Sequence, residues 1–388
     1  MIAWREADRA FSLLARSFDR RFKMAFQKSD GINYAPVGKA RAVVKPGEFI
    51  FAAAALDHGH IYGMCNGLIE AGAVLKKVYD PDEKKVAAFI ERYPEVAVAE
   101  SLDEILGDKE IHMVAAAAIP AKRCELGLKV LDAGKHYFTD KAPLTTLEQL
   151  KLAREAVART GKRYMCYYSE RLHVESAMLA GQMVEDGAIG EVLQVTCLAP
   201  HRLTPASRPE WFWDRELSGG TLCDLGSHQI EQFLHFTGNK SAKIVSAQRA
   251  NYFNPEHPDF DDFADANLIG ENGATQYLRV DWFTPDGLGA WGDGRLFLLG
   301  TKGYIEVRKY LDIARDAVGD HIYLADAQGE RYIKASGSVG FPFFGEMILD
   351  CLSGTEKAMT QDHIFTAAEL GVRAQMEAVR LDTAKFGR

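Results

Sequence analysis

A carboxylate and an imidazole stand four residues apart in the segment Ser-Gly-Gly-Thr-Leu-Cys-Asp-Leu-Gly-Ser-His, which ends at His228. Gly219 and Gly220 permit a tight turn, and Thr221 can cap the helix that we expect to follow. On a helix, Asp224 and His228 share one face, so the carboxylate can support the imidazolium that forms when the ring accepts a proton. The pattern is typical of a general base, although an isolated Asp-His pair on a solvated helix gives the same spacing.

The elements that must position this pair begin with an alternation of apolar strands and helices over residues 48–168. Strands with no polar alternation, separated by helices, predict a doubly wound parallel sheet of the Rossmann type, covered on both faces. The expected strands are 49–55, 74–79, 97–99, 111–118, 136–139 and 163–168, and the expected helices are 61–71, 84–93, 102–106, 123–133 and 147–160.

Beyond residue 168 the pattern changes, and residues 169–388 predict an α+β domain built on a mostly antiparallel open sheet. Turn signals separate long strands, and the last helix can pack back on the first domain. The expected strands are 191–198, 244–253, 262–269, 275–282, 295–299, 303–309 and 320–325, with helices over 174–186, 344–352 and 366–383.

Residues 1–47 precede both domains as an extension and an irregular lead-in. An amphipathic, Arg-rich helix is expected over residues 1–28. It is either a docking helix for another subunit or sequence upstream of a natural start at Met24.

The composition excludes several classes of function. A net charge of −8 over 388 residues argues against nucleic-acid binding, and no apolar run is long enough to cross a membrane. The six cysteines are scattered without a CxxC pair, which indicates reduced thiols in a cytoplasmic protein and neither a zinc site nor a disulfide framework. The chain therefore reads as a soluble two-domain protein.

The turn after the first expected strand partly matches a dinucleotide-binding fingerprint. GxGxxG would place glycines at 57, 59 and 62, where the chain has Asp57, Gly59 and Tyr62. Asp80 stands at the end of the second strand, where a carboxylate can accept hydrogen bonds from a ribose 2′-hydroxyl and disfavours a 2′-phosphate. This favours NAD over NADP, with turn initiation at Asp80-Pro81 as the alternative.

Two motifs resemble the glucose–fructose oxidoreductase/inositol dehydrogenase (Gfo/Idh/MocA) family, from about residue 48 onward. Asp140-Lys141-Ala-Pro143 resembles the family's Glu-Lys-Pro after the fifth strand, with the proline one position late. The double glycine followed by Asp224 and His228 resembles the family's glycine-rich turn and Asp-x-x-x-His.

The resemblance implies hydride transfer between a nicotinamide and a secondary alcohol or carbonyl carbon of a sugar, cyclitol or sugar derivative. It makes His228 the general acid/base, with Asp224 orienting substrate or imidazole and Lys141 completing the proton network. Lys141 would lie in the crevice at the carboxyl ends of the strands, where open α/β sheets bind ligands. The residues implied for NAD, with NADP possible, are Asp57, His58, Gly59, His60, Ile61, Asp80, Ile119, Pro120, Asp140 and Lys141.

For the substrate, a carbohydrate or polyol, we carry Arg171 and Arg202 as candidate ligands, because guanidinium groups bind hydroxyls or carboxylates. The resemblance also implies a homodimer or homotetramer assembled through the open face of the second sheet. Two other functions stay open at this point: a glycosidase that uses NAD for transient oxidation, and a non-catalytic regulator that binds nicotinamide or sugar.

Overall fold

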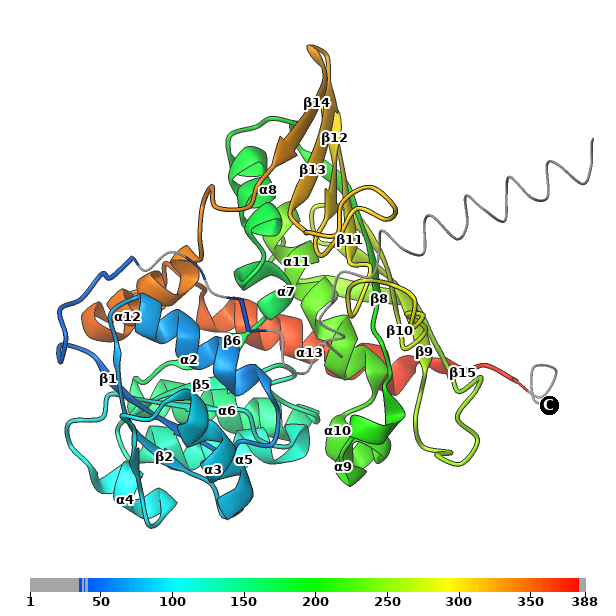
Figure 1. Ribbon diagram of the computed structural model, residues 1–388. Coiled ribbons are helices and arrows are strands. Elements are labelled where there is room, and N and C mark those ends of the chain that lie inside the picture. The colour runs from blue at the N-terminus through cyan, green and yellow to red at the C-terminus, as the bar shows by residue number, and fades with distance from the viewer. Residues whose placement is uncertain (1–34, 37, 39–40, 384–388) are drawn as a thin grey trace, which may run out of the picture.

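The computed structural model describes residues 35–36, 38 and 41–383, so the helix expected over residues 1–28 lies outside the described residues. The described chain forms two sheets (Figure 1). The first contains six parallel strands in the order β3-β2-β1-β4-β5-β6, and the second contains nine strands in the order β14-β13-β12-β11-β7-β10-β9-β8-β15. The predicted fold, a Rossmann sheet followed by a mostly antiparallel sheet, is confirmed.

The Rossmann sheet is buried because its central strands consist of small and apolar residues. Its strands are β1 (Ile50–Ala54), β2 (Val74–Tyr79), β3 (Ala97–Val98), β4 (Met113–Ala116), β5 (His136–Asp140) and β6 (Tyr164–Tyr167). The connecting helices are α2 (His60–Glu70), α3 (Glu83–Arg92), α4 (Leu102–Gly107), α5 (Pro120–Asp132) and α6 (Leu147–Thr160). The strand order reverses between β1 and β4, so a crevice at their carboxyl ends is where ligands of such folds bind.

The second domain begins with α7 (Ser169–Leu172) and α8 (Glu175–Glu185) and contains most of the large sheet. Its strands are β7 (Val192–Pro200), β8 (Ala242–Ala250), β9 (Phe263–Gly270), β10 (Thr275–Asp281), β11 (Arg295–Gly300), β12 (Gly303–Arg308), β13 (His321–Asp326), β14 (Gly329–Lys334) and β15 (Val379–Arg380). Burial alternates along β9 and β10. One face of this sheet is therefore packed and the other is open.

Helices cover the packed face and connect the two domains. Between β7 and β8 lie η1 (Pro205–Ser207), α9 (Glu210–Trp213), α10 (Arg215–Ser218), the π-helical turn η2 (Leu222–Gly226) and α11 (Ser227–Thr237). After β14 come α12 (Pro342–Ser353) and α13 (Gln361–Glu377). α11 packs on β7, while α13 packs on β8 and also on α6 and β6, and α12 packs on α2 (Figure 1).

The structure corrects the expected end of the chain. The last helix covers Gln361–Glu377 and not 366–383, because Thr360 caps its start by accepting the His363 N–H, and Ala378 is already extended. β14 and β15 were not predicted: β14 continues a hairpin from β13, and β15 adds two residues parallel to β8. Such short edge strands carry no periodic signal of their own.

None of the helices within the described residues is long and apolar enough to cross a membrane. All six cysteines lie in the described part of the chain, and none forms a disulfide bond. Five of them are buried in the core, where they pack as small apolar side chains.

Candidate active site

A cavity of about 230 Å³ lies between the carboxyl ends of the Rossmann strands and the helices of the second domain. Residues from both domains line it, so it depends on how the domains pack together. From the first domain come Asp57, His58, His60, Pro120, Arg123 and Lys141; from the second come Ser169, Glu170, His201, Ser207, Arg208, Pro209, Trp211, Phe212, Asp224, Leu225, His228, Trp282 and Trp291. The three predicted catalytic residues, Lys141, Asp224 and His228, are all among them.

Lys141 and Asp224 join the two domains across this cavity. The Lys141 ammonium donates to Asp224 Oδ1 at 2.6 Å, and the lysine side chain is only 5% exposed. Lys141 follows β5 directly, and the peptide bond between Lys141 and Ala142 is cis. The pair places a positive charge next to a carboxylate at one end of the cavity, where both groups can contact a substrate oxygen.

His228 lies in the first turn of α11 and is 2% exposed. Its Nδ1 is buried and has no hydrogen-bond partner among the described residues. Burial lowers the pKa of His228 well below its ordinary value; the Glu170 carboxylate acts in the opposite direction, and Lys141 and His60 add to the lowering. The ring is therefore neutral near neutral pH, which is the form that can accept a proton.

The segment before His228 differs from the expected capped α-helix. Thr221 is already helical and caps nothing, because its hydroxyl donates to the Asp261 carbonyl, and Leu222–Gly226 form a π-helical turn. The expected glycine turn is present: Gly219 and Gly220 have φ of +85° and +82°. The wider turn leaves Asp224 paired with Lys141, and no described hydrogen bond joins Asp224 to His228.

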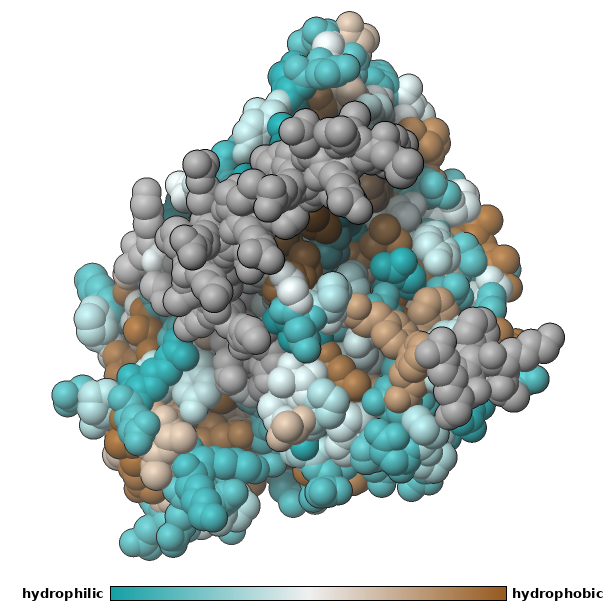
Figure 2. All heavy atoms as spheres, turned by 45° about the vertical axis from the view of Figure 1, so that its right-hand side comes forward, coloured by the Kyte–Doolittle hydropathy of each residue, from teal (hydrophilic) through white to brown (hydrophobic). Residues whose placement is uncertain are grey.

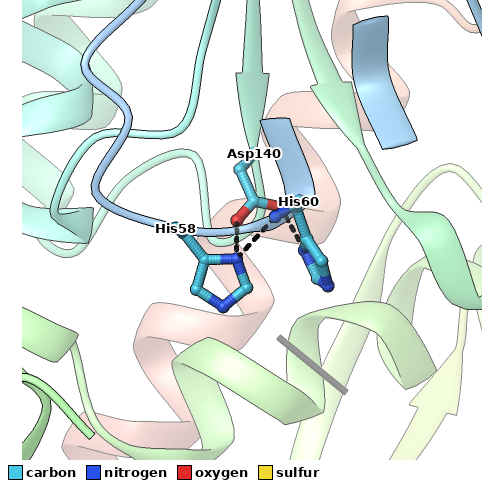
Figure 3. Close-up of side chains that lie close together, drawn as sticks. All are labelled: His58, His60 and Asp140. Carbon is cyan, nitrogen blue, oxygen red and sulfur yellow. Dashed lines mark hydrogen bonds and ion pairs between the residues drawn. The ribbon is translucent and has the colours of Figure 1, made fainter. Parts of the chain in front are cut away.

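Below the cavity, Asp140 lies beside two imidazoles (Figure 3). Its carboxylate is fully buried and lies 2.9 Å from His60 Nδ1 and 3.3 Å from His58 Nδ1. The Arg123 guanidinium, also buried, is 3.2 Å from the same carboxylate. Burial alone would raise the pKa of Asp140, but His60 and Arg123 hold it well below its ordinary value.

The donor atoms of His58, His60 and Asp140 lie within 4.8 Å of one another, a spacing that could hold a metal ion. The charges of the neighbouring side chains argue against a metal ion at this position. Arg123 already neutralises the Asp140 carboxylate, so a divalent cation would leave excess positive charge in a buried site. We therefore interpret the cluster as a hydrogen-bonded network, in which Asp140 accepts from His60 Nδ1 while His58 Nδ1 accepts the His60 backbone N–H.

The loop after β1 carries the acidic residue that replaces the first fingerprint glycine. Asp57 Oδ1 accepts from Lys85 Nζ at 2.6 Å, so its charge is balanced, and Oδ2 accepts the Ile119 N–H across the crevice at 3.3 Å. Asp80 accepts the Leu56 N–H at 2.6 Å and stands where the second strand ends.

The start of α2 provides a further place for a phosphate group. α2 begins after Gly59, and its first turn carries no acidic residue. His58 Nδ1 accepts the backbone N–H of His60, the first residue of the helix, at 3.2 Å. Helix N-termini of this kind bind phosphate groups. Ile61 is buried beneath the loop, and Pro120 opens α5 on the cavity wall. Asp57, His58, His60, Pro120 and Lys141, which were expected to contact the cofactor, line the cavity.

Arg171 and Arg202 do not line the cavity. Arg171 is buried in an ion pair with Glu231, to which it donates from both Nε and Nη2. Arg202 Nη2 donates to the carbonyl groups of Pro285, Leu288 and Ala290, and so holds a loop of the second domain. Both guanidinium groups serve packing contacts in this structure, away from the residues that surround the cavity.

Sequence reasoning missed Glu170, which is 2% exposed and lines the cavity. Its Oε2 accepts from Lys309 Nζ at 3.1 Å and from Gln229 Nε2 at 3.0 Å. The available signal was its position three residues after β6, at the carboxyl edge of the Rossmann sheet. Its partner Lys309 comes from the distant end of β12, which no local pattern could indicate.

The fold and the cavity define a Rossmann-type oxidoreductase with an added α+β domain. Comparison with known families agrees: residues 58–168 match the oxidoreductase family with an NAD-binding Rossmann fold, and residues 178–306 match the GFO/IDH/MocA C-terminal domain. The chain belongs to the GFO/IDH/MocA family. The Rossmann domain is accordingly of the NAD-binding class.

Individual relatives place the chain within that family. A crystal structure of a candidate oxidoreductase from Erwinia carotovora atroseptica is 49% identical, covers 86% of this chain and 100% of its own, and superposes with a TM-score of 0.84. Levoglucosan dehydrogenase from Pseudarthrobacter phenanthrenivorans is 30% identical over 40% of this chain and 39% of its own length. Scyllo-inositol 2-dehydrogenase (NADP⁺) from Bacillus subtilis is 27% identical over 41% and 44%. The chain thus spans less than half the length of these two curated relatives.

Proposed function

We propose that this protein is an NAD(P)-dependent dehydrogenase or reductase that acts on a CH–OH group of a small sugar, cyclitol or sugar derivative. The observation that carries the proposal is the meeting of Lys141, Asp224 and His228 on one cavity at the carboxyl edge of an NAD-binding Rossmann sheet. NAD, when bound, supplies the hydride acceptor. The names of relatives, which include a D-glucoside 3-dehydrogenase from Escherichia coli, support the substrate class.

In the oxidative direction, neutral His228 accepts the proton of the substrate hydroxyl as the carbon loses hydride. The Lys141 ammonium stabilises negative charge on the same oxygen, and Asp224 fixes the position of that ammonium through the 2.6 Å ion pair. Asp80, at the end of β2, would accept a hydrogen bond from a ribose hydroxyl of the cofactor, and Asp140 accepts from His60 Nδ1 at the crevice.

We also propose that copies of the chain assemble through the open face of the large sheet. Large apolar side chains are exposed on five of its strands: Leu193, Val245, Ile269, Leu299 and Tyr304. Figure 2 shows brown, hydrophobic surface along the side of the molecule that this sheet forms. An exposed apolar patch of this kind typically marks an interface.

The test is a fluorescence titration with NADH and NADPH, followed by turnover assays with NAD⁺ and neutral sugars and cyclitols. We expect saturable binding of NADH and reduction of NAD⁺ by at least one sugar or cyclitol. Failure of both nucleotides to bind would overturn the proposal. Light scattering measures assembly separately, and Val245→Lys with Ile269→Lys should yield a smaller species.

A further inference from the structure

We propose that Glu170, His201 and Trp282 form a binding wall for the hydroxyl groups of a neutral polyhydroxylated ligand, and that this wall rejects sugar acids. The inference deepens the proposed function, on whose cavity it rests. All three side chains line that cavity.

The first observation is an unfilled carboxylate oxygen. Glu170 Oε2 is engaged by Lys309 and Gln229, whereas Oε1 is buried with no hydrogen-bond partner among the described residues. Burial alone would raise the pKa of Glu170, but Lys309, His228 and His201 hold it well below its ordinary value. A buried, ionised oxygen without a donor is costly, so a hydroxyl donor on a ligand would be stabilised at this wall.

The second observation concerns His201. Its Nδ1 lies 3.1 Å from the Ala199 carbonyl, which only accepts, so Nδ1 carries the proton. Burial lowers the pKa of His201 to about 4, despite Glu170, so the ring is neutral and Nε2 is an acceptor. That nitrogen faces Glu170 Oε1 at 3.7 Å, too far for a hydrogen bond between them. Two acceptors therefore lie side by side, and a hydroxyl group that donates to either of them must approach from beside the pair.

The third observation is an unfilled donor on the same wall. The indole Nε1–H of Trp282 is buried and has no acceptor among the described residues. An adjacent pair of hydroxyl groups satisfies this set, since hydroxyls donate to Glu170 and His201 and their oxygens accept from Trp282. A carboxylate cannot donate, and an ammonium cannot accept. Rings of Trp282 and Trp211 offer apolar surfaces for the C–H faces of such a ligand.

The cations that line the cavity do not offset this preference. Lys141 is paired with Asp224, and Arg123 with Asp140. Arg208 donates from Nε and Nη2 to the carbonyls of Leu203 and Arg202 and lies over the Trp282 ring. A ligand carboxylate beside Glu170 would meet a like charge in a buried place, and such unpaired charges discriminate strongly between ligands.

The experiment measures binding by calorimetry to the protein saturated with NADH. The probes are the neutral compounds scyllo-inositol, levoglucosan, D-glucose and D-xylose, and the acids D-glucuronate and D-gluconate. We expect at least one neutral compound to bind at least about tenfold more tightly than either acid. Glu170→Gln should weaken that binding by about 10- to 100-fold, the usual effect of losing a hydrogen bond to a charged group. It should also reduce the difference in affinity between the neutral compounds and the acids. Trp282→Phe, which removes only the N–H donor, should weaken it several-fold.

Glu231→Gln is the matched control. Glu231 is also a buried glutamate with a buried cationic partner, Arg171, but it does not line the cavity. It should lower stability and leave the preference for neutral ligands unchanged. If Glu170→Gln does not fold because Lys309 loses its partner, the double variant with Lys309→Met replaces it.

The inference is overturned if the acids bind as tightly as the neutral compounds, if no neutral compound binds, or if both Glu170→Gln and Trp282→Phe leave affinity unchanged. Its failure is distinguishable from failure of the proposed function. Selective binding of neutral polyols without reduction of NAD⁺ would refute the dehydrogenase function and support the proposed binding wall. Turnover of acids in preference to neutral sugars would support the dehydrogenase function and refute the proposed binding wall.

Discussion

The two walls of the cavity differ in how their buried polar groups are paired. On the Rossmann side, the acidic groups are engaged: Asp57 by Lys85, and Asp140 by Arg123 and His60. On the side of the second domain, Glu170 Oε1, His228 Nδ1 and Trp282 Nε1 have no described partner. One wall is complete before any ligand binds, whereas the other is completed by one.

This difference teaches how the two halves divide the work. A satisfied hydrogen-bond network is rigid and specifies one geometry, which suits the binding of an invariant cofactor. Unfilled donors and acceptors cost stability but select the ligand that satisfies them. Substitutions in the first wall should therefore act mainly on stability and cofactor binding, and substitutions in the second mainly on turnover and ligand choice.

The largest effect is expected for His228→Ala, in the second wall. Loss of the proton acceptor should lower kcat by about 100-fold or more, the usual contribution of a general base, with unchanged affinity for NADH. Steady-state kinetics and fluorescence titration measure the two quantities. His257→Ala, which removes a ring stacked on Trp213 outside the cavity, is the control and should retain turnover. Full activity of His228→Ala would remove this residue from the mechanism.

Asp140→Asn tests the first wall. The change leaves Arg123 buried without its counter-charge, so we expect the free energy of unfolding to fall by about 3 kcal/mol. Urea denaturation followed by circular dichroism measures it. Asp362→Asn is the control, because its ion pair with Arg154 is exposed and should contribute little. Equal stability of the two variants would show that the first wall is not the rigid network described above.

The sequence predicted the elements and residues that have a local pattern, and it missed those that depend on contacts between distant segments. Elements with a strong local pattern, such as the apolar run of β1 and the periodic helices α2 and α6, were predicted nearly to the residue. Lys141, Asp224 and His228 carry motifs and were placed on the cavity. Glu170 was missed because its partners, Lys309 and Gln229, come from other elements. Arg171 looked like a ligand because a sequence does not reveal that Glu231 already neutralises it.

The π-helical turn at Leu222–Gly226 shows a second limit. One additional residue in a turn leaves no mark in the hydrophobic period, yet it decides which neighbour a side chain contacts. The spacing of Asp224 and His228 predicted a pair, whereas the folded chain joins Asp224 to Lys141. Local spacing placed both residues on the cavity but predicted the wrong contact between them.

Asp80→Ala tests whether the first wall selects NADH over NADPH. We expect affinity for NADH to fall about tenfold, the effect of one hydrogen bond to a charged group, and affinity for NADPH to fall less, because Lys85 Nζ lies 4.0 Å from Asp80 and favours a phosphate. Parallel fluorescence titrations give the ratio. Asp82→Ala, which removes only the cap of α3, should leave the ratio unchanged. An equal loss for both nucleotides would contradict the ribose role.

The smallest effect concerns pH and depends on two residues of the second wall, Glu170 and His228. Burial lowers the pKa of His228 well below its ordinary value, and Glu170 partly counters that lowering. Because the neutral ring is the active form, kcat/KM in the oxidative direction should stay level as the pH falls through about 6.5, the ordinary value for histidine. It should decline only at lower pH, when the buried ring is protonated.

Glu170→Gln removes the negative charge that raises the pKa of His228, so the acidic decline should move to still lower pH. Glu231→Gln leaves Glu170 in place and should not move it. The profile of kcat/KM against pH gives the result directly. It is measured only at pH values at which neither variant is unfolded by acid. A decline that stays at the same pH in Glu170→Gln would show that its carboxylate does not act on His228, and that the second wall binds ligand without changing the pKa of the base beside it.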